Sequence, residues 1–194
     1  MKVLIFDTET TGLPPTMAAP PEFWPRLVQC GLIFHPGAGD PTELSFIVKP
    51  AGFEIPERAT AVHGISTERA LAEGISLSSA LKLFGGYLKQ ADLVVCHNYA
   101  FDSNVMDGEF LRVFGKTFME RWPHYCTKEA STDLLKIPGY YGRYKWPTLD
   151  ELHRYLFKEG FDGAHDAMND TRATAKCFFE MRSRGLVPSE LCNA

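Results

Sequence analysis

The sequence is poor in cysteine, and its five cysteines follow no metal-binding or disulfide motif. They stand at positions 30, 96, 126, 177 and 192, far apart and without a Cys-x-x-Cys pair. An odd number of scattered cysteines argues against a disulfide framework and against a zinc knuckle. We therefore predict buried or inert thiols in a reducing compartment.

Long apolar runs are also absent. No stretch approaches the roughly 20 apolar residues that a membrane-spanning helix needs. At the N-terminus only four apolar residues in a row, Val3 to Phe6, precede Asp7, and no small-residue cleavage site follows them as in a signal peptide. The sequence therefore predicts a cytoplasmic protein with no membrane partner.

The chain has no excess of positive charge, because its formal net charge is −4. This value argues against a protein that grips nucleic acid by bulk charge alone. It does not argue against an enzyme whose carboxylates surround bound cations, because the cations would offset that charge. With 194 residues, of which 45% are apolar, we predict a single globular domain over residues 1–194.

Hydrophobic periodicity predicts an α/β fold. Short apolar runs predict strands, and the turn at 35–41 makes the second and third of them an antiparallel pair. Apolar residues at spacings of three and four, together with capping signals, predict the helices. The expected strands are 2–6, 26–34, 44–49 and 92–96, and the expected helices are 56–62, 77–90, 101–114, 148–157 and 166–184. This order favours a mixed sheet with helices on its faces, a proline-rich loop at 14–25 and a loose region at 115–147.

The first candidate site lies at the end of the first strand. Asp7 and Glu9 alternate with Thr8 and therefore project from the same side of that strand. Two neighbouring carboxylates repel each other unless a cation lies between them, and Mg²⁺ and Mn²⁺ prefer such oxygen ligands. Gly12 in the following turn would let the backbone approach a ligand closely. An exposed acidic strand end is the alternative.

Two further short segments each begin with a histidine and contain one or two acids. His97 to Asp102 follows the strand at 92–96, with Asn98 suited to a helix N-cap and Asp102 in the first helical turn. His165 to Asp170 opens the last helix, and a histidine there can act as a general base. In each case an acid that only stabilises a helix N-terminus is the alternative. Asp166, which shares a helix face with Asp170, is either a rival ligand or a cap. An HD-type phosphohydrolase would need more histidines and acids than can be assembled here.

Together the three segments resemble the DEDDh-type (DnaQ-like) 3′–5′ exonucleases of the ribonuclease H-like superfamily. Asp7 to Leu13 matches D-x-E-T-T-G-L, His97 to Asp102 matches H-N-x-x-F-D, and His165 to Asp170 matches H-x-A-x-x-D. The resemblance covers residues 1 to about 182 and includes the segment His63-Gly64-Ile65. It implies an α/β fold with a ribonuclease H-like mixed five-stranded sheet and helices on both faces.

The resemblance also implies a role for each matching residue. Two divalent cations, Mg²⁺ or Mn²⁺, would be held by Asp7, Glu9, Asp102 and Asp170. Asp102 would act through a metal-bound water or in the outer coordination shell of the metal. His165 would be the general base of a two-metal phosphodiester hydrolysis that releases nucleoside 5′-monophosphates. The expected substrate contacts are Thr8, Thr10, Thr11, Gly12, Leu13, His63, Asn98 and Phe101.

The substrate and the partners stay open at this point. The implied substrate is the 3′ end of a nucleic acid, single-stranded DNA first and RNA as the alternative, since no residue decides on the ribose 2′-OH. A stand-alone enzyme is expected, because the chain ends about ten residues after the last helix. A proofreading or binding subunit of a polymerase is the alternative. Whether the protein forms a homodimer is left open. The connector 136–147 interleaves aromatic and basic residues, which suits single-stranded nucleic acid or simply a pinned surface loop.

Overall fold

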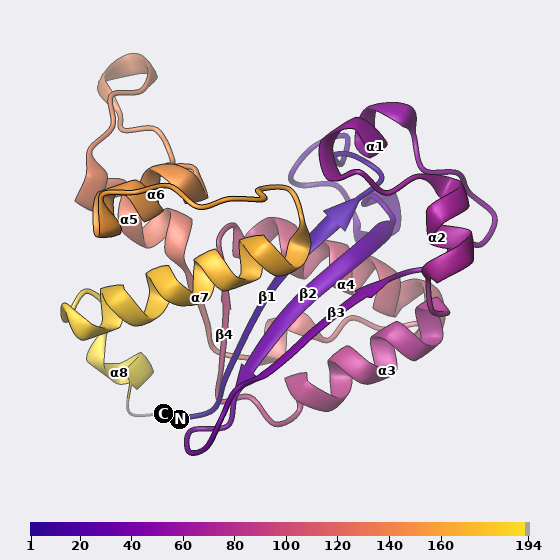
Figure 1. The fold of residues 1–194 in the computed structure, drawn as a ribbon, viewed down its shortest axis with the longest axis horizontal. Coiled ribbons are helices and arrows are strands. Elements are labelled where there is room, and N and C mark those ends of the chain that lie inside the picture. Colours follow the sequence, from indigo (N-terminus) through magenta and orange to yellow (C-terminus); the bar gives the residue numbers. More distant parts are fainter. Residues whose placement is uncertain (193–194) are drawn as a thin grey trace.

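The centre of the fold is a mixed five-stranded sheet. The computed structural model describes residues 1–192, and its sheet has the order β3-β2-β1-β4-β5 (Figure 1). β1 (Val3–Thr10) pairs antiparallel with β2 (Leu27–His35), which pairs antiparallel with β3 (Thr42–Ile47). β4 (Leu93–Cys96) runs parallel to β1, and β5 (His124–Cys126) runs parallel to β4. The expected mixed sheet and its antiparallel pair are confirmed.

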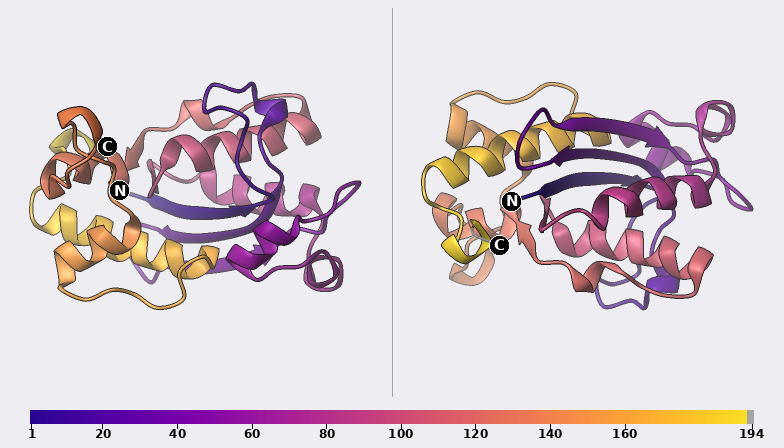
Figure 2. Two further views of the ribbon diagram at one scale, coloured as in Figure 1. Left: turned by 90° about the horizontal axis from the view of Figure 1, so that it is seen from above. Right: turned by 90° about the horizontal axis from the view of Figure 1, so that it is seen from below.

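Helices cover both faces of this sheet, as expected (Figure 2). α3 (Leu77–Leu88) and α4 (Tyr99–Phe114) pack on one face. α6 (Leu149–Phe157) and α7 (Ala167–Ser183) pack on the other, with α5 (Thr127–Leu135) against them. Shorter elements complete the described chain: α1 (Glu57–His63), α2 (Thr67–Glu73), α8 (Ser189–Cys192) and the 3₁₀ turns η1 (Pro21–Phe23), η2 (Met119–Arg121) and η3 (Tyr140–Gly142).

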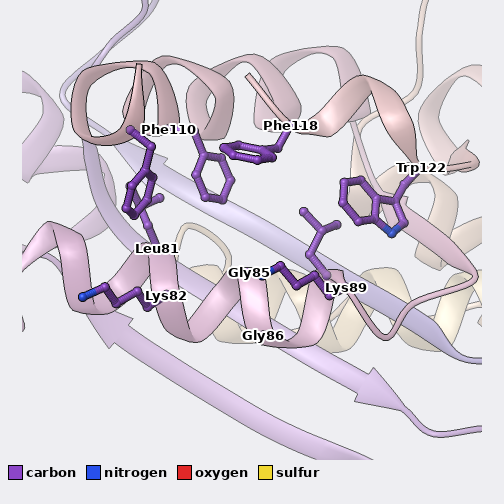
Figure 3. A pocket seen from close by; sticks show the side chains of 10 residues that line it. Leu81, Lys82, Gly85, Gly86, Lys89, Phe110, Phe118 and Trp122 are labelled. Atoms are coloured by element: carbon purple, nitrogen blue, oxygen red, sulfur yellow. The ribbon is translucent and has the colours of Figure 1, made fainter. Parts of the chain in front are cut away.

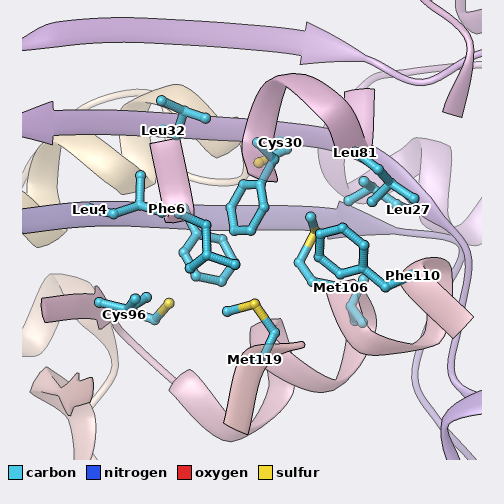
Figure 4. Packing of buried hydrophobic residues seen from close by; sticks show 14 of the residues in the cluster. Leu4, Phe6, Leu27, Cys30, Leu32, Leu81, Cys96, Met106, Phe110 and Met119 are labelled. Carbon is cyan, nitrogen blue, oxygen red and sulfur yellow. The ribbon is translucent and has the colours of Figure 1, made fainter. Parts of the chain in front are cut away.

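The alternation of side chains along β1 decides which way its acids face. Leu4 and Phe6 are fully buried in the cluster under α3 and α4 (Figure 4). Val3 and Ile5 belong instead to the cluster under α6 and α7. Because successive strand residues point to opposite faces, Asp7 and Glu9 continue the row of Val3 and Ile5. Both carboxylates therefore lie on the α7 side of the sheet, which confirms that they project together.

The region 115–147, expected to be loose, contains regular structure. β5 has three residues, too few to show an alternating pattern, and its pairing with β4 is what defines it. α5 buries Thr127 and Ser131 completely, and only Leu135 at its end adds an apolar contact to that face, so its inner face shows no apolar period. α2 is likewise too short for a periodic pattern. Tertiary pairing, rather than local sequence, specifies these elements.

The cysteines behave as expected where their side chains are described. Cys30, Cys96, Cys126 and Cys177 are free and buried. Burial raises the pKa of the Cys30 and Cys96 thiols well above the ordinary value, which keeps them protonated and unreactive. The side chain of Cys192 lies outside the described part of the structure. Among residues 1–192, no helix combines the length and the apolar character that a membrane crossing requires.

Candidate active site

The three sequence motifs meet in one groove of about 620 Å³ at the carboxyl ends of β1 and β4. Since these two strands are parallel neighbours, the residues that follow them arrive at the same edge of the sheet. α7 brings the third motif to this edge across β1 and β2. The groove is lined by all five expected catalytic residues, Asp7, Glu9, Asp102, His165 and Asp170, and by the expected contacts Thr8, Leu13, Asn98 and Phe101.

Asp102 is fixed in the first turn of α4 by the strand opposite. Its Oδ1 accepts hydrogen bonds from the Thr8 amide at 3.1 Å and from the Thr8 hydroxyl at 2.7 Å. The carboxyl is buried, with 3% of the residue exposed. Thr8 was expected to contact substrate; in this structure its amide and its hydroxyl orient Asp102.

The start of α7 is held by a cap and by the sheet. Asp166, the N-cap residue, accepts from the amides of Met168 and Asn169, and its other oxygen accepts from the Gln29 side chain of β2. The side-chain oxygen Oε1 of Gln29 in turn accepts from the Ala167 amide. Of the two alternatives for Asp166, the structure therefore shows the cap. Gln29 thus holds the start of α7, a contact that the sequence motifs do not reveal.

Asp170 and His165 meet Glu9 above the sheet. The potential ligand atoms of these three residues lie within 4.8 Å of one another, which makes a candidate metal site. The His165 amide donates a hydrogen bond to Asp170 Oδ2 at 2.9 Å, which orients the Asp170 carboxylate. His165 itself has a φ of 67°, a left-handed conformation that is rare outside glycine and asparagine. This backbone bend leaves the imidazole exposed at the rim of the groove.

The electrostatics of the cluster fit a divalent cation. Burial, followed by repulsion from Asp102, Asp170 and Glu9, raises the pKa of Asp7 well above its ordinary value. Burial and the charge of Asp170 raise the pKa of Glu9 to about 8, and burial raises that of Asp102 to about 7 in spite of the hydrogen bonds from Thr8. Burial also raises the pKa of Asp170. Carboxylates that resist ionisation together become stable as anions when a cation of high charge lies among them, and all-oxygen donors suit Mg²⁺ and Mn²⁺.

His97 ties the groove to the connector above it. Its Nε2 lies 3.2 Å from the carbonyl oxygen of Pro147, which can only accept, so Nε2 carries the proton. Nδ1 then accepts from the Thr127 hydroxyl at 2.9 Å. Burial lowers the pKa of His97 to about 4, which keeps the ring neutral in this bridge. His97 therefore joins the ends of β4, α5 and the connector rather than acting as a base.

Lys128 is a further residue at this edge that the motifs do not contain. Its ammonium donates to the side-chain oxygen of Asn98 and lies 4.3 Å from the centre of the Trp146 ring. Asn98 occupies the N-cap position of α4 as expected, but its side chain makes no capping bond and its φ is 131°. The side chain that was expected to cap α4 thus binds Lys128 instead. No signal in the sequence marks Lys128, because it follows β5, a strand that only its pairing with β4 defines.

Of the four remaining expected contacts, all but Thr11 line an adjoining hollow of about 540 Å³ between the β1 turn and α1. It shares Thr8, Glu9, Leu13 and Phe101 with the groove and adds Thr10, Gly12 and His63. Leu13 is 82% exposed there, as a residue that contacts a ligand would be. Thr11 instead pins the turn, because its hydroxyl accepts from the Arg26 amide and its own amide donates to the Arg26 carbonyl.

The proline-rich segment 14–25 supports this hollow from behind. Arg112 of α4 donates to the carbonyl oxygens of Glu22 and Trp24. The buried Trp24 ring meets Phe101 edge-on, with centroids 5.6 Å apart. The segment is therefore packed against α4, and it positions the aromatic wall of the groove.

A third hollow, of about 350 Å³, lies between α3 and α4 and differs in chemistry (Figure 3). It is bounded by apolar side chains such as Phe110, Phe118 and Trp122, by Gly85 and Gly86, and by Lys82 and Lys89. No carboxylate is among its lining residues, so it offers nothing to a divalent cation. Of these three hollows, the acidic groove and its neighbour are the ones that suit hydrolysis.

Comparisons with known proteins agree with this geometry. A model of the RNase_T exonuclease family matches residues 4–178. The "DNA polymerase III subunit epsilon-like protein" of Rhodobacter capsulatus is 30% identical over 193 residues, a match that covers 94% of this chain and 24% of that protein.

Solved structures of exonuclease I share the fold. One has a TM-score of 0.72 at 21% identity, covering 94% of this chain and 41% of that chain. The E. coli enzyme in complex with a dA16 oligonucleotide has a TM-score of 0.69 at 20% identity, covering 94% and 41%. The enzyme from Methylocaldum szegediense has a TM-score of 0.67 at 20% identity, covering 94% and 40%.

The chain spans 24% of its curated relative and 40–41% of these exonuclease I chains. The family model, by contrast, matches most of this chain and includes all three motifs. The chain therefore belongs to the RNase_T exonuclease family, the DnaQ-like 3′–5′ exonucleases of the ribonuclease H-like superfamily.

Proposed function

We propose that this protein removes nucleotides one at a time from the 3′ end of a nucleic acid, using divalent cations held by Asp7, Glu9, Asp102 and Asp170. The observation that supports this most strongly is the convergence of these four carboxylates and His165 on one groove from β1, α4 and α7. Their raised pKa values fit a site that becomes fully ionised only when cations are bound.

Each protein group has a defined role in this proposal. When bound, two Mg²⁺ or Mn²⁺ ions supply the Lewis-acid chemistry of phosphodiester hydrolysis. His165, at the exposed rim, accepts the proton of the attacking water through its imidazole. Thr8 holds Asp102 in place, and Leu13 and Phe101 contact the terminal nucleotide where the two hollows join. Attack at the terminal phosphorus releases a nucleoside 5′-monophosphate and leaves a new 3′-hydroxyl.

The proposed substrate is single-stranded DNA. Several of the exonuclease I structures that share this fold are complexes with single-stranded DNA, among them those with dA16 and dT13. The open groove and the exposed side chain of Leu13 suit an unpaired 3′ end, whose base is free to contact apolar surface. RNA is the alternative substrate.

The name of the curated relative favours a second candidate, the proofreading subunit of a polymerase. In that case the same chemistry would serve a partner enzyme. Gel filtration and a pull-down with a polymerase would distinguish this candidate from a stand-alone enzyme: a stable complex supports the subunit, and a free chain with full activity supports the stand-alone enzyme. The elution volume also reports a homodimer.

Degradation of end-labelled strands tests the proposal. Single-stranded DNA and RNA of matched sequence, labelled at the 5′ end, are incubated with Mg²⁺, with Mn²⁺ and with EDTA, beside an Asp7→Asn variant. We expect a ladder that shortens from the 3′ end, needs the metal and is absent in the variant. No degradation of either polymer with either metal would contradict the proposal.

A further inference from the structure

The connector between α5 and α6 forms a projecting hairpin rather than a loose loop. The amide of Gly139 donates to the Arg143 carbonyl and that of Lys145 to the Ile137 carbonyl, and Pro138 bridges to Tyr144. We call residues 137–145 the hairpin. Figure 1 shows it rising beyond α5 and α6, away from the sheet.

The tip of the hairpin displays aromatic rings that nothing in the fold requires. Tyr140 is 89% exposed and Tyr141 completely so. Tyr141 also has a φ of 56°, a left-handed conformation that is costly for a bulky side chain. Trp146, just after the hairpin, is 63% exposed. Exposed aromatic rings on a strained, hydrogen-bonded turn stabilise no core, so their use lies outside the folded chain.

The charge around these rings favours an anionic partner. Residues 136–147 contain Lys136, Arg143 and Lys145 and no acidic residue. Lys145 forms an ion pair with Glu151 at the base of the hairpin, at 2.6 Å. Within residues 1–192, Lys136 and Arg143 form no ion pair, so both cations are available to phosphates. Aromatic faces interleaved with cations are the chemistry that binds unpaired nucleotides, because any base can stack on a ring.

The base of the hairpin is continuous with the acidic groove. The Trp146 ring lies against Lys128, which holds Asn98 of the groove wall. The next residue, Pro147, is bonded to His97, and Thr148 lines the groove itself. A strand whose 3′ end lies among the carboxylates therefore has a connected surface leading from the groove to the hairpin.

We infer that the hairpin, with Trp146 at its base, binds the single strand upstream of the 3′ end and so makes affinity depend on substrate length. This inference rests on the proposed function, since it names how the same site holds its substrate. A dinucleotide occupies only the groove, whereas a longer strand also stacks on Tyr140 and Tyr141. The hairpin thus contributes to binding of long strands and not to the chemical step.

Binding and turnover, measured separately, test the inference. Anisotropy of labelled dT and rU dodecamers is recorded in EDTA, which prevents hydrolysis, for wild type and for the Tyr140→Ala/Tyr141→Ala double variant. Tyr155→Ala removes a tyrosine of α6 that is 38% exposed and lies outside the hairpin, and it serves as the matched control. Because Tyr140 and Tyr141 are exposed, the unfolding temperature of the double variant is expected to stay at the wild-type value.

We expect the double variant to bind both dodecamers roughly 10-fold or more weakly, at the cost typical of losing aromatic stacking, while the control binds as wild type does. With Mg²⁺, its KM should rise by a similar factor for the dodecamer, with kcat and dinucleotide turnover unchanged. Arg143→Gln should instead flatten the dependence of log K on log salt by about 0.7, the value for one phosphate contact on a single strand.

Wild-type affinity in the double variant would overturn the inference, and would be the result if the hairpin bound only a protein. An equal loss of dinucleotide turnover would also overturn it, because the tyrosines would then act on the groove. The outcomes for the two proposals are distinct. Hairpin-dependent binding in EDTA without any hydrolysis refutes the exonuclease alone, and normal hydrolysis with length-independent affinity refutes the hairpin role alone.

Discussion

Burial raises the pKa of Glu9 to about 8 and that of Asp102 to about 7, so the acidic cluster retains protons near neutral pH when no cation is present. Between the ordinary glutamate pKa of 4.5 and about 8, folded Glu9 keeps a proton that the unfolded chain has lost. The stability of the metal-free protein should therefore fall as the pH rises through this window. Cations bind only the ionised cluster, so their effect should grow over the same range.

This reasoning predicts coupled effects of pH and metal on unfolding. In EDTA, we expect the protein to melt at a lower temperature at pH 8.5 than at pH 5.5. Mg²⁺ at about 100 times its Kd should add roughly 5–10 °C at pH 8.5 and much less at pH 5.5. Thermal scans of wild type, of Glu9→Gln and of Asp133→Asn, an exposed carboxylate of α5, provide the check. A metal shift that is the same at both pH values, or that survives in Glu9→Gln at full size, contradicts the assignment.

A variant of His165 distinguishes two roles for this residue, that of a general base and that of a metal ligand. Its ring nitrogen lies close enough to Glu9 and Asp170 to be a ligand, while its exposed position suits a general base. We expect His165→Ala to lower turnover by about 10²–10⁴ and to keep the Mg²⁺-dependent rise in melting temperature. Single-turnover rates and thermal scans on one preparation measure both. A near-normal rate would remove the assigned role, and loss of the thermal shift would make His165 a ligand.

At this scale the sequence could predict the acids and the histidine but not their supports. Asp7, Glu9, Asp102, His165 and Asp170 follow from three short motifs, and the structure brings them together as expected. The motifs could not show that Gln29 holds the cap of α7 or that Lys128 binds Asn98. Contacts between residues far apart in the chain leave no local pattern, so these supports appear only in three dimensions.

At the scale of the elements, the position of α7 depends on one glycine of β2. A Cβ on Gly31 would lie 2.4 Å from the Ala167 carbonyl oxygen, and the Gly31 carbonyl accepts from the Thr171 hydroxyl of α7 at 3.1 Å. Gly31 is also the register partner of Asp7. Close approach of strand and helix thus determines how near Asp170 lies to the acids of β1.

We predict that Gly31→Ala forces α7 away from the sheet. It should destabilise the fold by about 1–3 kcal/mol, as overpacking does, and lower the affinity for Mg²⁺ because Asp170 moves with the helix. Gly86→Ala on α3 is the control: a Cβ there meets no atom within 4 Å, and alanine in a helix should stabilise by about 0.5–1 kcal/mol. Chemical denaturation with and without Mg²⁺ measures both. Wild-type stability and metal affinity in Gly31→Ala would contradict the role given to this contact.

Elements with a strong local signal were predictable, and those defined by pairing were not. The capping box of Thr148 and Glu151 marks the start of α6 as expected. The run from Val3 to Phe6 marks β1 in the same way. β5 is specified by β4, and α5 buries hydroxyl side chains on its inner face, so neither has a pattern that sequence alone could reveal.

At the scale of the whole molecule, the proposed substrate path is formed by parts of the chain that are far apart in sequence. The sheet edge carries the acids, the segment 14–25 supports Phe101 through Trp24, and the hairpin stands beyond α5 and α6. The chain matches only 24% of its longer curated relative, so the path is proposed for the region that the two proteins share. A net charge of −4 is compatible with this path because, in the proposed function, the acids of the groove would bind cations rather than meet phosphates directly.

The most direct test of the central proposal is the fate of the oxygen from water. A 3′-hydroxyl oligonucleotide is digested with Mg²⁺ in ¹⁸O-labelled water, and the products are identified by mass. Attack by water on the terminal phosphorus predicts nucleoside 5′-monophosphates that each carry one ¹⁸O in the phosphate, beside shortened strands with an unlabelled 3′-hydroxyl. Products with 3′-phosphates, or 5′-monophosphates without the label, would contradict the proposed hydrolysis.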